Sequence, residues 1–376
     1  MSKTVAFFNG FYLPHFGGVE RYTYNIAQKL IAKGYNIIVV TTQHEEYLKE
    51  EEVVDGIKVY RLPIRNVWKN RYPFLKKNKE YRRTLEKIKS ENIDYYIVNT
   101  RFYMTSILGA SLASENGKEA MIIEHGTTYL TMNNPVVDFF LHQIERTLIQ
   151  HIKKNTATFY GVSQEAANWL TEFGVESKGV VYNAIDSSDF DNYYSRLKDT
   201  SDKIIISYSG RLQAKFKGVE TLLSAFSKLS QEVDHLELII AGDGPIYKDM
   251  VAQYTQENIK FLGRVPHDKV MEINNKSDIF VLLSKIEGFS TAMLEAALLK
   301  NVVITTNVGG ARELIPNENF GFIIENDETV LLDTLRSLVQ DMDKIRRIQE
   351  NVSQRVLENY TWDKTAESFV KAFEIL

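Results

Sequence analysis

The chain has 376 residues, of which 44% are hydrophobic and 25% charged, a composition typical of soluble globular proteins. This length exceeds the usual single-domain core, so two domains are expected. The sequence has no cysteine, which excludes disulfides and thiolate metal sites, and no apolar run near the ~20 residues that cross a membrane. The first residues lack the apolar region of a signal peptide, so a cytoplasmic location is expected.

Short apolar segments alternate with longer amphipathic ones in the first half of the chain. The strand-like segments are residues 5–8, 35–41, 57–62, 95–99, 120–124 and 158–162. The helical patterns between them are residues 19–33, 81–90, 104–115 and 136–153. This alternation predicts parallel βαβ units.

The same pattern begins again in the second half. Its strand-like segments are residues 204–209, 236–241, 259–262, 279–284, 302–305 and 322–325. We therefore predict an α/β fold with two Rossmann-like, doubly wound parallel-sheet domains facing each other across a cleft. The boundary is expected near residues 181–186. Ligands of such sheets bind beyond the carboxyl ends of the strands, which predicts a site in the cleft.

Two turns of the first half are candidate ligand contacts. Gly17 and Gly18 follow the first strand and let the backbone approach a ligand at the start of a helix, although an ordinary turn needing positive φ is the alternative. His125 follows the strand at residues 120–124, where it either bonds a substrate hydroxyl or is a histidine satisfied at a sheet edge.

A cationic loop follows the strand at residues 204–209. Gly210-Arg211 and Lys217-Gly218 place two cations beside glycines near an expected helix start. Such an arrangement suits a diphosphate. A solvated basic loop is the alternative.

Two carboxylates, Glu287 and Glu295, flank a predicted turn and helix start. The turn is Gly288-Phe289-Ser290-Thr291, whose backbone N–H groups are suited to a phosphate. Glu287 is expected to face a sugar, and Glu295 to accept hydrogen bonds from ribose hydroxyls. Surface glutamates are the less favoured interpretation, because hydrophobic residues surround both.

Other charged patterns carry weaker predictions. The basic and aromatic stretch Arg65–Arg83 suits an anionic membrane surface or lipid-linked acceptor, with a solvated helix and loop as the alternative. The D-x-D pairs Asp189/Asp191 and Asp341/Asp343 lie outside the predicted strand–helix junctions, so no metal is expected. No nucleic-acid module is recognised, and no nucleic-acid partner is expected.

Taken together, these motifs resemble those of the retaining glycosyltransferases of family 4, which have the GT-B architecture. The resemblance spans nearly the whole chain. Besides the segments above, it rests on Phe16-Gly17-Gly18-Val19-Glu20, Ala241-Gly242-Asp243-Gly244-Pro245, Phe261-Leu262-Gly263-Arg264-Val265, Asn307-Val308-Gly309-Gly310-Ala311-Arg312-Glu313 and Tyr360-Thr361-Trp362.

The resemblance implies a role for each candidate residue. Arg211 and Lys217 stabilise the diphosphate leaving group, Glu287 contacts the donor sugar, and His125 lies near that sugar. The implied donor-binding residues are Gly17, Gly18, Gly210, Gly263, Arg264, Val265, Gly288, Phe289, Ser290, Thr291 and Glu295. The implied reaction retains the anomeric configuration, with the leaving phosphate taking the acceptor proton, and needs no metal or other cofactor.

The resemblance also implies a domain division and a substrate class. Residues 1–185 with a final crossing helix at about 361–376 are expected to bind the acceptor, and residues 186–360 the nucleotide sugar. UDP is favoured over GDP, and the acceptor is a glycan or lipid-linked glycan in cell-surface polysaccharide or glycoconjugate synthesis. A sugar-nucleotide epimerase and a non-catalytic GT-B partner subunit are the alternatives. Ser290-Thr291-Ala292 replaces the Gly-Leu-Pro of many relatives, which is expected to alter the sugar pocket.

Overall fold

A computed structural model describes residues 2–15, 17–67, 72–132, 134–194, 203–213 and 217–376. Phe16, Trp68, Lys69 and Arg71 of the predicted motifs lie outside the described residues. The chain divides into two compact units, one formed by Met1–Tyr182 with Thr365–Leu376 and the other by Asn183–Lys364. No described helix is both long and apolar enough to pass through a bilayer.

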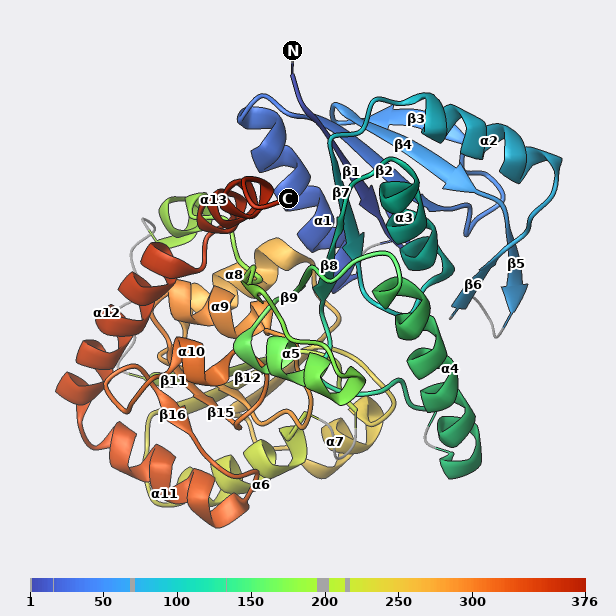
Figure 1. Cartoon of the computed structure of the whole chain (residues 1–376). Coiled ribbons are helices and arrows are strands. Elements are labelled where there is room, and N and C mark those ends of the chain that lie inside the picture. The colour runs from blue at the N-terminus through green and yellow to red at the C-terminus, as the bar shows by residue number, and fades with distance from the viewer. Residues whose placement is uncertain (1, 16, 68–71, 133, 195–202, 214–216) are drawn as a thin grey trace. The chain divides into compact units, whose positions relative to one another are not determined.

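The first unit is built on a sheet with the strand order β10-β9-β8-β7-β1-β2-β4-β3 (Figure 1). Every pairing in it is parallel except that of β3 with β4. The strands are β1 (Thr4–Phe8), β2 (Asn36–Thr42), β3 (Glu51–Val54), β4 (Ile57–Leu62), β7 (Tyr95–Asn99), β8 (Ala120–Glu124), β9 (Phe159–Gly161) and β10 (Gly179–Val180). The strand order reverses between β1 and β7, which is where such sheets bind ligands.

Helices cover both faces of this sheet. Alternate residues of β1 point to opposite faces. Phe8 belongs to the core shared with α2 (Lys79–Ser90), α3 (Met104–Glu115) and α4 (Pro135–Lys153), whereas Phe7 contacts Phe369 of α13 (Trp362–Phe373). Tyr22 of α1 (Gly18–Ala32) also contacts Phe369. The end of the chain therefore completes the core of the first unit. The remaining helices of this unit are α5 (Gln164–Trp169) and a 3-10 turn at Leu170–Phe173.

A separate antiparallel hairpin of β5 (Ile64–Val67) and β6 (Tyr72–Leu75) precedes α2. The interpretation of Arg65–Arg83 as helix and loop is therefore wrong in its first part. Tyr72 donates a hydrogen bond to the backbone oxygen of Phe102. This contact joins β6 to the segment before α3, which no local pattern in the sequence reveals.

The second unit has a parallel sheet with the order β13-β12-β11-β14-β15-β16. Its strands are β11 (Ile204–Ser209), β12 (Leu236–Ala241), β13 (Ile259–Gly263), β14 (Ile279–Leu282), β15 (Val302–Thr305) and β16 (Phe322–Ile323). Its helices are α6 (Val219–Leu229), α7 (Tyr247–Gln253), α8 (His267–Lys276), α9 (Thr291–Leu298), α10 (Ala311–Leu314), α11 (Glu328–Val339) and α12 (Met342–Asn359), besides a π-helical turn at Phe190–Tyr194. The strand order reverses between β11 and β14.

The two-sheet, parallel α/β prediction is confirmed. The predicted strands at residues 204–209, 236–241 and 302–305 have the observed bounds. The strand predicted at 279–284 ends at Leu282, because the chain then turns into the loop that carries Glu287. The sequence did not predict β3, β5, β6 or β10, which are short and lack a continuous apolar run.

Candidate functional site

An ion pair lies where the strand order of the second unit reverses. Lys217, after β11, donates from Nζ to Glu287 Oε1, after β14, across 70 positions of sequence. Ser284 Oγ donates to the same carboxylate oxygen at 2.7 Å. The exposed fractions of the Lys217 and Glu287 side chains are 26% and 14%, so the pair is half-buried and within reach of a ligand.

Gly218 explains how Lys217 reaches this position. Its φ is +69°, in the left-handed region that other residues rarely adopt, and it precedes the first residue of α6. A Cβ atom at Gly218 would lie 2.7 Å from the backbone oxygen of Leu283. The loop that carries Lys217 and Gly218 therefore passes directly against the end of β14, where the loop that carries Glu287 begins.

The turn after Glu287 is held in a fixed conformation. Asn183 Nδ2 donates to the backbone oxygen of Phe289 at 2.8 Å, and the Phe289 ring is buried beside Tyr360. Gly309 has a φ of +51°, and a Cβ on it would lie 2.5 Å from the oxygen of Gly288. The predicted motif at Gly309 thus makes room for the turn at Gly288-Phe289.

The turn leads directly into α9, whose first residue is Thr291. Ser290 is the N-cap residue, but its hydroxyl makes no capping hydrogen bond. The first backbone N–H groups of a helix have no intrahelical acceptor, and the helix dipole favours an anion beside them. This helix start therefore has the properties that the sequence predicted for a phosphate contact.

Glu295 lies within α9 and is almost fully buried, with 4% of its surface exposed. Its Oε1 is 3.0 Å from Nε2 of His267, the first residue of α8. A buried carboxylate requires polar partners, and His267 supplies one. The structure thus connects Glu295 to the segment between β13 and α8, which contains Arg264 and Val265 and is preceded by Gly263 at the end of β13.

The remaining predicted donor residues of the second unit lie at the end of β13 or in the loops after β11 and β13. The Gly210 N–H donates to Ala241 O at 3.0 Å, and the Gly242 N–H donates to Gly263 O at 2.8 Å, so these loops are neighbours. The side chains of Arg211 and Arg264 are exposed. Val265 packs on a small apolar cluster of Ile205, Ile239, Ala241 and Ile273. Arg211 thus lies in the predicted loop, but no described contact joins its side chain to the Lys217–Glu287 pair.

In the first unit, a polar network surrounds His125 at the carboxyl ends of β1, β7 and β8. Asn99 Nδ2 donates to Asn9 Oδ1 and to Thr23 Oγ1, both at 3.0 Å. The side-chain oxygen of Asn99, Oδ1, is 2.8 Å from His125 Nε2 and accepts a hydrogen bond from it. Burial lowers the pKa of His125 to about 3, so the imidazole is neutral at pH 7. Its proton then lies on Nε2, and Nδ1 is an acceptor.

Gly17 and Gly18 lie at the start of α1, but neither has positive φ. The interpretation that this turn needs a left-handed residue is therefore wrong. A Cβ at Gly17 would lie 2.5 Å from the Glu20 carboxylate, and a Cβ at Gly18 would meet nothing within 4 Å. Burial raises the pKa of Glu20, which lies beneath this turn. The two glycines leave the backbone open to a ligand.

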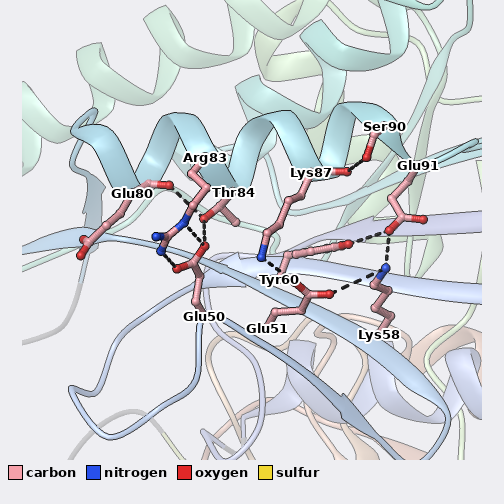
Figure 2. Close-up of polar contacts among 10 residues, drawn as sticks. All are labelled: Glu50, Glu51, Lys58, Tyr60, Glu80, Arg83, Thr84, Lys87, Ser90 and Glu91. Atoms are coloured by element: carbon pink, nitrogen blue, oxygen red, sulfur yellow. Dashed lines mark hydrogen bonds and ion pairs between the residues drawn. The ribbon is translucent and has the colours of Figure 1, made fainter.

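The basic stretch is divided between paired and unpaired cations. Arg83 of α2 forms an ion pair with Glu50, whose other oxygen accepts from Thr84, and Lys87 pairs with Glu51 at 2.8 Å (Figure 2). Glu50 lies outside the basic stretch and is distant in sequence, so the residues of the stretch do not reveal its pairing with Arg83. By contrast, Arg65, Lys76 and Lys77 line a pocket of ≈ 540 Å³ with Phe74, Leu75 and Met104.

No group of three or more His, Asp or Glu side chains suited to a metal ion occurs in the part of the chain that the structure describes. Asp341 of the second D-x-D pair is the N-cap of α12 and accepts from the Lys344 N–H at 2.8 Å. Its carboxylate therefore has a structural role at a helix start.

Sequence reasoning missed several residues that hold these sites. Three of them contact predicted site residues, namely Ser284, Asn183 and His267. Asn183 and His267 are far in sequence from the residues that they contact, and Ser284 belongs to no recognised motif. Asn9 and Asn99 offered a usable signal, because each lies at or just after the end of a predicted buried strand.

Two family models match the chain. The model described as Glycosyltransferase Family 4 matches residues 16–189, and the model described as Glycosyl transferases group 1 matches residues 189–355. Together they span residues 16–355, and each contains the candidate residues of one unit.

Similar proteins are found by sequence and by structure. The phosphatidylinositol N-acetylglucosaminyltransferase GPI3 subunit of Saccharomyces cerevisiae is 27% identical, covering 99% of this chain and 83% of the relative. Sucrose-phosphate synthase from Thermosynechococcus elongatus has a TM-score of 0.74 at 16% identity, covering 99% of this chain and 98% of that one. Anabaena Alr3699/HepE, in complex with UDP and glucose, has a TM-score of 0.69 at 16% identity, and each chain is covered fully. The structural likenesses establish the fold.

Proposed function

Because the chain belongs to glycosyltransferase family 4 and has the GT-B fold, we propose that it is a retaining, metal-independent enzyme that transfers a sugar from a UDP-sugar. The acceptor we propose is a glycan or lipid-linked glycan in cell-surface polysaccharide or glycoconjugate synthesis. The observation that carries the proposal is the Lys217–Glu287 pair at the strand reversal of the second unit. A cation and a carboxylate held together there suit a sugar diphosphate, because one binds phosphate and the other sugar hydroxyls.

In this proposal, the donor diphosphate competes with Glu287 for Lys217. Lys217 and Arg211 stabilise the charge that develops on the leaving phosphate, and the first N–H groups of α9 bind the same diphosphate. Glu287, released from part of its ion pair, accepts from a sugar hydroxyl. Glu295 with His267 would bind the ribose, and Gly263, Arg264 and Val265 the base.

The proposed transfer needs no protein nucleophile. The acceptor oxygen forms a bond to the anomeric carbon while the bond from that carbon to the phosphate oxygen breaks on the same face. The acceptor proton passes to the leaving phosphate. Gly17 and Gly18 are retained as backbone contacts to phosphate, and His125 as a neutral contact to the sugar.

A lipid-linked acceptor is supported by the yeast relative, whose name describes transfer to phosphatidylinositol. Cations at Arg65, Lys76 and Lys77 support contact with anionic lipid. We therefore propose a location at the inner face of the cytoplasmic membrane, with Arg65–Arg83 contributing to attachment. A second candidate, a partner subunit without activity, is favoured by one observation, which is that the same relative is called a subunit.

The first test is thermal stabilisation by UDP and by GDP, in the wild type and in Arg211→Ala. A ligand present at 100 times its dissociation constant adds ~2.7 kcal/mol of stability to the unit that binds it. We expect stabilisation by UDP that the substitution weakens. Sugar transfer from a panel of UDP-sugars then separates the enzyme from an inactive subunit. No stabilisation by either nucleotide would contradict the proposed donor site.

A further inference from the structure

The most unusual surface of the first unit lies on the first half of α4. Several large apolar side chains on or beside it are exposed. Their exposed fractions are 40% for Met132, 68% for Val136, 37% for Val137, 59% for Phe139, 61% for Phe140 and 50% for Ile144. Singly exposed apolar residues are common, but a contiguous group on one helix marks an interaction site.

These residues do not belong to the core-facing side of α4. Ile149 and Ile152 belong to the core of the first unit, and Leu141 is buried as well. Val136, Phe140 and Ile144 recur every four residues, so they form a different stripe along the helix. The first half of α4 is therefore apolar on its outer side too, where a surface helix usually carries polar residues.

The two carboxylates of this part of α4 already have partners within the chain. Asp138 accepts hydrogen bonds from the Met132 N–H and the Thr131 hydroxyl, and Glu145 is buried in an ion pair with Arg101 at 2.6 Å. Further along the outer side, the stripe continues through exposed residues, which are Thr147, His151 and Lys154. Of these residues, Lys154, which follows the last residue of α4, is a lysine. Apolar side chains on a helix with a cation at its end are a feature of helices that lie in a membrane interface.

The cationic pocket of Arg65, Lys76 and Lys77 belongs to the same unit. Among the described residues that line it, none is acidic, and its apolar wall is formed by Phe74, Leu75 and Met104. The hairpin and α4 both contact the short segment between β7 and α3. Tyr72 of β6 donates a hydrogen bond to the backbone oxygen of Phe102, and Glu145 of α4 pairs with Arg101. In Figure 1 the hairpin lies to the right of α3, and α4 extends below α3. Cations and apolar side chains together match the phosphates and acyl chains of a lipid surface.

We propose that α4 docks the chain onto an anionic phospholipid bilayer. Val136, Phe140 and Ile144 enter the boundary between head groups and acyl chains, and Arg65, Lys76 and Lys77 bind lipid phosphates. The inference deepens the proposed function, because a lipid-linked acceptor lies in the same surface.

The test is sedimentation of the full chain with vesicles made of equal parts phosphatidylglycerol and phosphatidylcholine. Phe139→Ser with Phe140→Ser is expected to lower the partition coefficient by about tenfold or more, since burying one such ring is worth at least that factor. The matched control is Tyr47→Ser with Val53→Ser, which removes equally exposed apolar side chains from the same unit and leaves binding unchanged. Lys76→Glu with Lys77→Glu is expected to weaken binding most at low salt.

A fluorescent variant gives a second readout that does not depend on loss of binding. Phe140→Trp is expected to show a blue-shifted emission with these vesicles, and Tyr47→Trp no shift. Equal sedimentation of the Phe139/Phe140 variant and the wild type would overturn the proposal. So would a change of its oligomeric mass or a fall of its thermal stability without vesicles, because the apolar face would then be covered by protein.

The result of the vesicle-binding test does not depend on the proposed donor site. If UDP stabilises the chain and sugar reaches a water-soluble acceptor, but vesicles do not bind, the docking inference and the proposed membrane location fail, and the proposed sugar transfer stands. If vesicles bind through α4 and neither nucleotide stabilises the chain, the proposed function fails and the docking inference stands.

Discussion

At the scale of single residues, Lys217 has the most specific role, because its ammonium group is already held at the strand reversal by Glu287. We expect Lys217→Ala to lower turnover by ~10²–10³, equivalent to ~3–4 kcal/mol of transition-state stabilisation. The measurement is the rate of sugar transfer at saturating donor. Lys285→Ala is the matched control, because that exposed lysine lies in the loop after β14. Turnover of the Lys217 variant within a few-fold of wild type would remove this residue from the mechanism.

His125 offers a prediction on protonation. Its pKa of about 3 means that the imidazole stays neutral while the unfolded chain takes up a proton near pH 6.5. His125 therefore costs stability progressively as the pH falls from about 6.5 toward 3, and nothing above that range. Nitrogen NMR of the folded chain is expected to show protonated Nε2 and no titration between pH 5 and 8.

The neighbouring amide provides a check on this assignment. Asn99→Asp places a carboxylate 2.8 Å from His125 Nε2 and is expected to raise the imidazole pKa, since an opposite charge favours the cation. An imidazole that titrates near 6.5 in the folded wild type would contradict the burial argument.

At the scale of elements, the approach of the loop before α6 to the end of β14 determines the cation–carboxylate pair. Gly218→Ala is expected to destabilise the second unit by more than the ~1–2 kcal/mol of left-handed backbone alone, because the new Cβ would also press on Leu283. Gly117→Ala separates the two effects, since Gly117 has a similar φ of +66° and nothing within 4 Å of the Cβ position. Denaturant unfolding measures both variants, and equal losses would show that the contact with Leu283 relaxes freely.

The same elements show what a sequence can predict. Buried parallel strands such as β11 and β12 are continuous apolar runs, so their bounds are readable. The predicted turn and helix at Gly288–Thr291 also follow from local residue types. The pairing of Lys217 with Glu287 does not, because it joins positions 70 residues apart and depends on which strands are neighbours. The sequence likewise predicted α4 as a helix but not its exposed apolar side, since periodicity alone does not show which stripe meets the core.

At the scale of the whole molecule, the chain enters the second unit at Asn183 and returns to the first at Thr365. The last residues are therefore far from the first in sequence yet belong to one core. Thr365 Oγ1 donates to Tyr182 O at 2.9 Å, which joins the two ends of this excursion. Because the second unit is inserted between parts of the first, the first unit can form its complete core only after the whole chain has been synthesised.

Phe369 tests this organisation. Its ring is fully buried, with centroids 6.4 Å from Phe7 and 6.3 Å from Tyr22. Phe369→Ala removes a large core side chain and is expected to destabilise the first unit by ~3–5 kcal/mol. By contrast, the residues proposed to bind the diphosphate leaving group, the ribose and the base, such as Lys217 and Glu295, lie in the second unit. Calorimetry should therefore show one unfolding transition lowered, while the stabilisation of the other by UDP is retained.

Ile375→Ala is the control for Phe369→Ala, because Ile375 lies near the same chain end with 82% of its surface exposed. Its removal is expected to leave both transitions in place. If Phe369→Ala instead lowered both transitions together and weakened UDP binding, the two units would not be energetically separate. In that case the end of the chain would couple the two units energetically, and α13 would transmit stability between them.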